Sequence, residues 1–214
     1  MAQSLWHNLR MRRAVSPLSR IYVPDALAPG AAVCLPPAAA HHLSRVLRAA
    51  LGDEVVVFGA GIEYSATITR MGGGAITVKL GAGRAVDREM PLPCRLAQAV
   101  SSGDRMDITL QKAVELGVSS VQPIFSERSV VRLSDERATK RVAHWRQVMI
   151  SACEQCGRNL IPDLAPPLSF ADWLATLAPA TEGAVRILLS PQASARPIDL
   201  PLAAPRVDHA AGGA

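Results

Sequence analysis

The spacing of apolar residues changes near residue 84, and this change constrains the fold more than any other feature. Before it lie three β-like runs separated by glycine turns: Glu54 to Phe58, Ile62 to Arg70 and Ala75 to Leu80. Short runs punctuated in this way predict a small meander or barrel. After it, strand-like and helix-like segments alternate, which predicts a parallel sheet covered by helices. The chain is therefore expected to hold two domains and to belong to the α/β class.

The first domain is expected to span residues 20–83. It begins with a short strand at Arg20 to Val23, and Ala38 to Ala50 is predicted to be helical. Its glycine clusters lie between or after β runs and none opens a helix, so they predict turns and not a nucleotide-binding loop. Residues 1–19 are basic and lack acidic residues, and we expect a disordered leader there. Residues 84–93 are polar and contain prolines, as a linker would.

The second domain is expected to span residues 94–207. Three strands are predicted, at Arg95 to Val100, Val118 to Phe125 and Val185 to Ser190, with helices at Asp104 to Leu116 and from near Ser134 to Cys156. In open parallel sheets, ligands bind at the carboxyl ends of the strands. The expected binding edge therefore consists of residues 98–104, 125–132 and 189–192.

The second of these helices ends in an unusual group of polar residues. Gly157 is a natural left-handed cap, and Pro162 prevents the helix from continuing. Glu154 and Arg158 are four residues apart and are expected to share a helix face, which makes them candidate catalytic residues. The alternative is an ordinary exposed ion pair. One apolar stripe is expected to face the core: Val142, Trp145, Met149, Ala152 and Cys156.

Charge favours an RNA partner. The 214-residue chain has a net charge of +5 and contains only three lysines, so that its basic surface is almost wholly arginine. Arginine binds phosphate bidentately and stacks on bases. The alternative is that the arginine excess merely reflects a GC-rich genome. His41 and His42 are adjacent in the helix of the first domain, and one of them is expected to face RNA.

Other classes of protein are disfavoured. No run approaches the roughly 20 apolar residues of a membrane span, and the first twenty residues lack a secretory pattern, which favours a cytoplasmic protein without a membrane partner. No metal-ligand spacing is present, so that no metal is expected. Cys153 and Cys156 form a C-x-x-C pattern, but a redox role is disfavoured because they lie late in a helix, where its dipole does not stabilise a thiolate.

Several separated motifs together carry a resemblance to a known family. Arg20-Ile-Tyr-Val-Pro24 and His41-His42-Leu43 with Arg45-Val-Leu-Arg48 lie in the first domain. Gln111-Lys-Ala-Val-Glu-Leu-Gly-Val118, Glu127-Arg128-Ser129, Glu154-Gln155-Cys156-Gly157-Arg158 and Ile161-Pro162 lie in the second. From about Arg20 to Pro191 the chain resembles the RsmE family, ribosomal RNA small-subunit methyltransferase E.

The resemblance implies a fold, a reaction and a set of contacts. It implies a PUA-like RNA-binding barrel followed by a SPOUT methyltransferase domain with a trefoil knot, which methylates N3 of a uridine in 16S rRNA with S-adenosyl-L-methionine. A homodimer is usual for the family. The small ribosomal subunit is the expected partner. The expected RNA contacts are Arg20, His41, His42, Arg45, Arg48 and Arg128, and the expected cofactor contacts are Leu189, Ser190 and Pro191.

The chain departs from the family after the third predicted strand. Family members continue into a Leu-Leu-Val-Gly-Pro-Glu-Gly-Gly stretch and a later Ile-Leu-Arg-x-Glu-Thr-Ala stretch, and neither occurs here. We therefore expect a SPOUT domain that lacks its C-terminal knot, and an aberrant tail at residues 208–214 that is a frameshifted reading of the missing strand. The alternative function is a non-catalytic RNA-binding remnant of such an enzyme.

Overall fold

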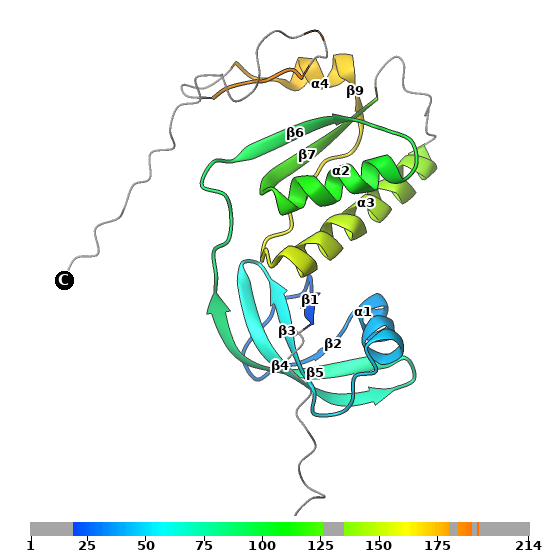
Figure 1. Cartoon of the computed structure of the whole chain (residues 1–214), viewed down its shortest axis with the longest axis vertical. Helices are drawn as coiled ribbons and strands as arrows, with labels where there is room; N and C mark the ends of the chain where they lie inside the picture. Colours follow the sequence, from blue (N-terminus) through cyan, green and yellow to red (C-terminus); the bar gives the residue numbers. More distant parts are fainter. Residues whose placement is uncertain (1–18, 126–134, 180–183, 190–191, 193–214) are drawn as a thin grey trace, which may run out of the picture.

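The computed structural model describes residues 19–125, 135–179, 184–189 and 192, and these form two domains joined by an extended segment (Figure 1). The first domain contains β1 (Arg20–Tyr22), β2 (Ala32–Cys34), α1 (Pro37–His41), η1 (His42–Val46), β3 (Glu54–Gly59), β4 (Ile62–Gly72) and β5 (Ala75–Ala85). The second contains β6 (Cys94–Ala99), α2 (Asp104–Glu115), β7 (Val118–Phe125), α3 (Asp135–Cys156), β8 (Asp163–Leu164), β9 (Leu168–Ser169) and α4 (Phe170–Thr176).

The first domain is a five-stranded sheet in the order β1-β3-β4-β5-β2. The predicted meander is confirmed, because β3, β4 and β5 pair as antiparallel neighbours. Apolar residues alternate along β4 and β5, and their inward side chains, such as Ile68 and Val78, form the core of this domain. Two features differ from the expectation: β2 was not predicted, and β5 continues to Ala85, into the predicted linker.

The predicted helix at Ala38 to Ala50 is shorter and irregular. Pro37 begins α1, as proline favours the first helical turn, and the chain then widens into the π-helical segment η1, which ends at Val46. Arg48 has a φ of +53°, a left-handed conformation that ends helical geometry. The last residues of the predicted helix therefore form a turn that leads toward β3.

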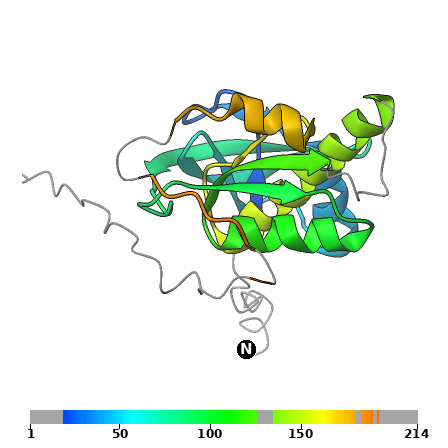
Figure 2. The same ribbon diagram turned by 90° about the horizontal axis from the view of Figure 1, so that it is seen from above.

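The second domain has a parallel sheet in the order β6-β7-β8, and β9 also pairs with β7. The predicted first helix of this domain is confirmed as α2, whose Met106, Leu110 and Val114 are buried. Trp145, Met149 and Ala152 of α3 are buried as predicted, but Cys156 is exposed and Cys153 is fully buried instead. Figure 2 shows α2 and α4 on opposite sides of the strands.

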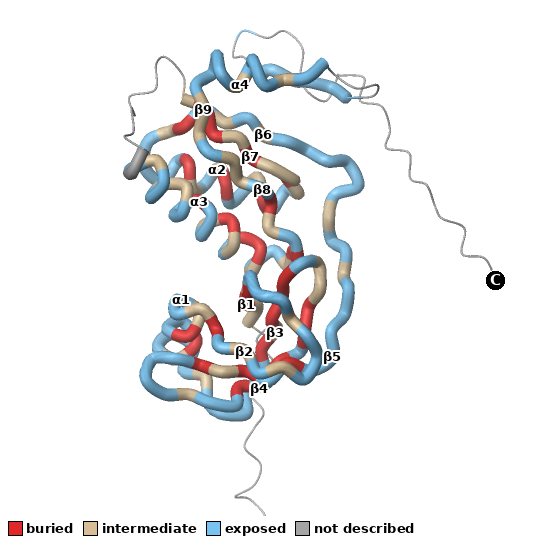
Figure 3. Tube along the Cα trace, turned by 180° about the vertical axis from the view of Figure 1, so that it is seen from behind, coloured by how far each residue is buried: buried red, intermediate tan, exposed pale blue. Residues whose placement is uncertain are grey.

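The predicted strand at Val185 to Ser190 is wrong for the part that is described. Residues 184–189 form no strand, and Leu188 and Leu189 are 83% and 75% exposed. In the described part of the chain it is β8 and β9, earlier in sequence, that pair in parallel with β7. The short helix α4 follows β9 and contains no buried residue, as its pale colour in Figure 3 shows.

Some expectations concern residues outside the described part. The basic leader up to residue 18, Arg128, Ser190, Pro191 and the tail at 208–214 all lie there. None of the helices in the described part of the chain combines the length and hydropathy that crossing a bilayer requires.

Candidate RNA interface between the two domains

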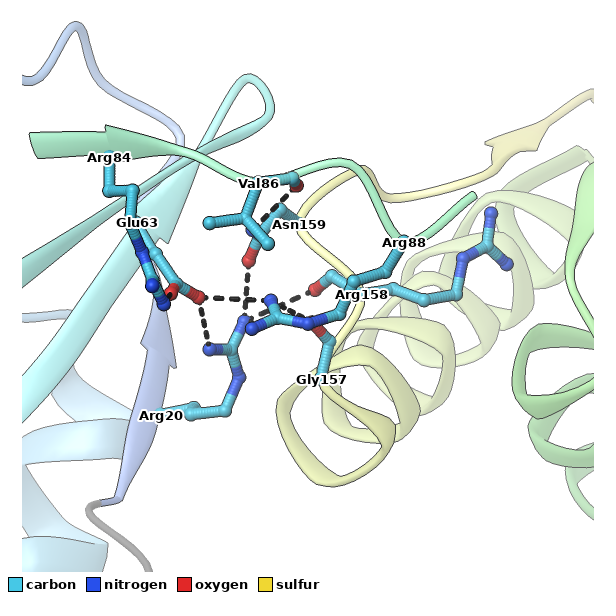
Figure 4. A network of polar contacts seen from close by, with 8 residues as sticks. All are labelled: Arg20, Glu63, Arg84, Val86, Arg88, Gly157, Arg158 and Asn159. Atoms are coloured by element: carbon cyan, nitrogen blue, oxygen red, sulfur yellow. Dashed lines mark hydrogen bonds and ion pairs between the residues drawn. The ribbon is translucent and has the colours of Figure 1, made fainter. Parts of the chain in front are cut away.

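A carboxylate in the first domain is the centre of the contact between the domains. Glu63 of β4 is buried and accepts hydrogen bonds from Arg20 at 2.9 Å, Arg84 at 2.6 Å and Arg88 at 3.0 Å (Figure 4). Burial raises the pKa of Glu63, but the hydrogen bonds from Arg88, Arg84 and Arg20 outweigh it and lower the pKa to about 2. The carboxylate is therefore ionised at neutral pH and neutralises part of a three-arginine cluster.

Arg20 extends this contact from β1 to the segment that follows α3. Its Nη2 donates to Asn159 Oδ1 at 2.5 Å and to the carbonyl oxygen of Gly157 at 3.2 Å. Its guanidinium lies 4.6 Å from the centre of the Phe58 ring, as a cation–π contact. Asn159 in turn donates to the carbonyl of Val86 at 3.1 Å. We call Arg20, Glu63, Arg84, Arg88 and Asn159 the inter-domain clamp.

Arg20 is an expected RNA contact, but in this structure its side chain binds within the protein. Its side chain is only 15% exposed, and both of its terminal nitrogens are bound to protein acceptors. A phosphate could reach this guanidinium only by displacing Glu63 or Asn159. The structural role of Arg20 was not evident from the sequence, because its acidic partner Glu63 lies 43 residues away in the chain.

Arg158 also binds inside the protein. Its side chain extends away from the clamp in Figure 4, and its Nη1 donates to the carbonyl oxygens of Val114 at 3.0 Å and Val118 at 2.9 Å. Its other nitrogens form a bidentate ion pair with Glu89 of the linker. With 5% of its surface exposed, Arg158 ties the linker to the turn between α2 and β7.

Glu154 and Arg158 do not share a face. The predicted cap is confirmed: Gly157 has a φ of +91° and donates its N–H to the carbonyl of Cys153 at 3.0 Å. Because the helix ends at Cys156, this left-handed turn redirects Arg158 away from Glu154. Glu154 instead accepts a hydrogen bond from the backbone N–H of Tyr22 at 3.1 Å.

The end of α3 also lies at the amino edge of the sheet, opposite the carboxyl edge where ligands are expected to bind. Arg158 binds the carbonyl of Val118, the first residue of β7, whereas the carboxyl edge is formed by Ala99 and Phe125. At about 3.3 Å per residue, the length of β7 separates the two edges by about 23 Å. The candidate catalytic pair therefore lies far from the edge where ligands of parallel sheets bind.

A groove between the domains lies beside Glu154, with a volume of about 530 Å³. It runs between α1 and η1 of the first domain and the C-terminal half of α3. Burial raises the pKa of Glu154, and the hydrogen bond from Tyr22 and the charges of His42 and Arg20 oppose this only in part. Its lining side chains include Tyr22, Pro36, Ala39, His42, Gln147 and Ser151.

The other predicted RNA contacts of the first domain lie on an open surface. His41, His42, Arg45 and Arg48 are all exposed, and His42 lines the groove. Of the predicted cofactor contacts, Leu189 is exposed and outside any strand. The described residues contain no group of three or more His, Cys, Asp or Glu side chains placed to hold a metal ion. Burial raises the pKa of Cys153 to about 12, so that this thiol stays protonated and unsuited to redox chemistry.

Three residues of this interface were missed at the level of sequence: Glu63, Glu89 and Asn159. Glu63 interrupts the apolar alternation of its strand, and an acid at a buried strand position requires a cationic partner. The arginines of the linker, Arg84 and Arg88, were the available partners. The signal for Glu63 was therefore present, whereas nothing local indicates the contacts of Asn159.

Comparisons with known proteins agree with this two-domain arrangement. A family model described as an RNA methyltransferase domain matches residues 88–210, and a model of the PUA domain of RNA methyltransferases matches residues 35–81. The ribosomal RNA small subunit methyltransferase E of Buchnera aphidicola subsp. Schizaphis graminum is 29% identical over 86% of this chain and 74% of that protein. The protein of the same name from Synechocystis sp. is 31% identical over 69% of this chain and 47% of that protein.

Two solved structures that match the chain are also methyltransferases. A putative methyltransferase from Legionella pneumophila with bound SAM is 35% identical, with a TM-score of 0.79 over 86% of this chain and 75% of that chain. Ribosomal RNA small subunit methyltransferase E from Neisseria gonorrhoeae, bound to S-adenosyl methionine, is 41% identical, with a TM-score of 0.71 over 76% of this chain and 67% of that chain. Because the methyltransferase model covers more than half of its residues and these relatives share both domains, the chain belongs to the ribosomal RNA small subunit methyltransferase E family.

Proposed function

We propose that the protein methylates N3 of a uridine in 16S rRNA of the small ribosomal subunit with S-adenosyl-L-methionine. The observation that carries this proposal is the similarity to the Neisseria gonorrhoeae enzyme, whose structure contains S-adenosyl methionine. The clamp supports it, because an RNA-binding domain held rigidly against a methyltransferase domain can position one nucleotide for reaction. A ribosomal substrate would place the protein in the cytoplasm.

The donor would bind at the carboxyl edge of the second sheet, in an incomplete domain of the SPOUT (trefoil-knot) class. S-Adenosyl-L-methionine supplies an electrophilic methyl group there. Leu188 and Leu189 fit such a ligand, because their apolar side chains are 83% and 75% exposed and a purine ring needs apolar contact. We keep Leu189, Ser190 and Pro191 as the proposed contacts, and a homodimer as the proposed assembly.

The reaction requires that the N3 proton of the uridine leave before or during methyl transfer. Neither Arg158 nor Glu154 suits this task in the geometry described above, since each is bound to the protein at the amino edge of the sheet. We propose positioning roles for both: Arg158 holds the linker through Glu89, and Glu154 holds β1 through the N–H of Tyr22. The base that accepts the proton is expected among the residues near the carboxyl edge.

Two measurements test this function. Isothermal titration calorimetry of the full chain with S-adenosyl-L-methionine should show saturable binding, and tritium should pass from the labelled donor to small ribosomal subunits that lack the modification. Binding of RNA without binding of the donor would contradict the proposal and favour the non-catalytic RNA-binding remnant. Transfer to a base other than uridine, as read by mass spectrometry of the digested RNA, would contradict the proposed substrate.

A further inference from the structure

The groove between the domains has two walls of different chemistry. One wall belongs to the first domain and is mainly apolar, with Pro36 just before α1 and Ala38 and Ala39 within it. The other wall is the exposed face of α3, where Gln147, Ser151 and Gln155 recur every four residues and so form one stripe. Tyr22 and Glu154 lie where the two domains meet. A flat ring could stack against the first wall while its edge meets the second.

Most polar side chains on the α3 wall of the groove are not used within the described part of the protein. Gln147, Ser151 and Gln155 make no side-chain hydrogen bond to any described residue, although the clamp beside them is almost fully paired. Glu154 uses Oε1 for the N–H of Tyr22, and its Oε2 accepts no hydrogen bond from the described residues. The groove therefore offers amide, hydroxyl and carboxylate groups to a ligand.

The rim of the groove carries arginine and histidine side chains. His42 and Arg146 line it and are exposed, and His41 and Arg45 lie beside His42 along α1 and η1. Of the lining residues only Glu154 is acidic. A phosphodiester suits such a rim, and the base of the same nucleotide supplies a flat ring for the apolar wall. The volume of about 530 Å³ falls within the range of about 300–1,000 Å³ that is usual for small-ligand sites.

We propose that this groove binds one unstacked nucleotide of single-stranded RNA, with the base between α1 and α3 and its phosphate on the rim. The proposal rests on the proposed function for the presence of an RNA substrate. The bound nucleotide is not the methylated one, because the groove lies along the C-terminal half of α3 against the first domain, whereas the donor is proposed to bind at the carboxyl edge of the second sheet. The groove thus anchors the RNA at a distance from the reaction.

Filling the groove tests the proposal. Ser151→Trp places a large side chain between the walls, and Ala143→Trp is the matched control, since Ala143 is exposed on the same helix but does not line the groove. The full chain is titrated, without methyl donor, into a short unstructured RNA labelled with fluorescein, and anisotropy gives Kd. Ser151→Trp should weaken binding about tenfold or more, as expected for the loss of one stacked base, and Ala143→Trp less than about twofold. Equal affinities of the two variants would overturn the proposal.

Two further variants separate base contacts from phosphate contacts. Gln147→Ala should weaken binding with an unchanged dependence on salt, whereas Arg146→Ala should lower the slope of log K against log salt by about 0.7, as one contact to single-stranded RNA does. A duplex of equal length that competes as well as the single strand would overturn the proposal, as would displacement of the RNA by an acidic peptide and not by unlabelled RNA. So would a wild-type chain that binds no RNA.

The results also separate this inference from the proposed function. Normal methyl transfer by the wild-type chain together with unchanged RNA binding by Ser151→Trp would support the proposed function and contradict the proposed nucleotide site in the groove. In the reverse pattern, RNA binding depends on the groove but S-adenosyl-L-methionine does not bind. That result would support the nucleotide site and contradict the proposed function. Circular dichroism melting of both tryptophan variants confirms that each is folded.

Discussion

Arginines lie on both sides of the C-terminal end of α3, but the two sides differ in what the arginines bind. On the clamp side, Arg20 and Arg88 bind the ionised Glu63 and backbone carbonyls. On the groove side, Arg146 is exposed and lies among polar side chains that have no partner in the described part of the chain. An arginine count therefore does not measure an RNA-binding surface, because acids and free carbonyls within reach decide which arginines remain for phosphate.

The largest expected effect concerns Arg158, which is buried against the linker. Arg158→Ala should destabilise the protein by about 3–5 kcal/mol, because it leaves the carboxylate of Glu89 without its cationic partner and removes the hydrogen bonds to the carbonyls of Val114 and Val118. Urea denaturation measures this, with Arg45→Ala as the control, since Arg45 is exposed and should cost less than about 0.5 kcal/mol. An Arg158→Ala protein of normal stability and reduced turnover would instead support the catalytic role expected from sequence.

A smaller effect should depend on pH. The pKa of Glu63 falls from its ordinary value of 4.5 to about 2 in the folded protein, which corresponds to about 3 kcal/mol. Because the folded pKa is lowered, this stabilisation is present above pH 4.5 and is lost as the pH falls toward 2. Glu63→Gln should therefore lower the free energy of unfolding at pH 7, and the difference from wild type should shrink across this window. A difference that is independent of pH would show that the carboxylate is not the source of the stabilisation.

The smallest effect should appear in RNA binding and leave stability nearly unchanged. Arg45→Ala combined with Arg48→Ala should lower the salt slope of binding to small-subunit RNA by about one for each arginine–phosphate pair that the substitutions remove. Arg20→Ala should do the opposite: it should lower stability and leave the salt slope of the folded protein as it is, because its guanidinium is covered. An Arg20→Ala protein with a reduced slope would show that the clamp opens to admit RNA.

Regular elements with a strong apolar period could be predicted from sequence, as β7 and α2 show. The bounds of β7 agree at both ends, and α2 ends one residue early. The same holds for the cap at Gly157, where glycine alone relieves the left-handed strain. Elements without a period were missed: β8 and β9 contain two residues each, and their position depends on the edge of β7 and not on their own side chains.

The candidate site was harder to predict for a different reason. The sequence identifies Glu154 and Arg158 as important, but their roles depend on partners 132 and 69 residues away, Tyr22 and Glu89. A shared face would require an unbroken helical period, which the turn at Gly157 interrupts. Arg45 of η1 and Arg48 after it are exposed, as a phosphate contact requires, and the chain has no acidic residue between Asp25 and Asp53.

Phe58 lies on a strand of the first domain, yet it is fully buried in the hydrophobic core of the second, and the ring of Tyr22 packs against it at 5.8 Å between centroids. Removing either domain would transfer this aromatic surface to water, at a cost of about 25 cal/mol for each Å² uncovered. The linker thus separates the two domains in sequence, but the stability of each domain depends on contacts with the other. Heating should melt the two halves in a single transition, and a fragment cut within residues 84–93 should carry an exposed aromatic patch prone to self-association.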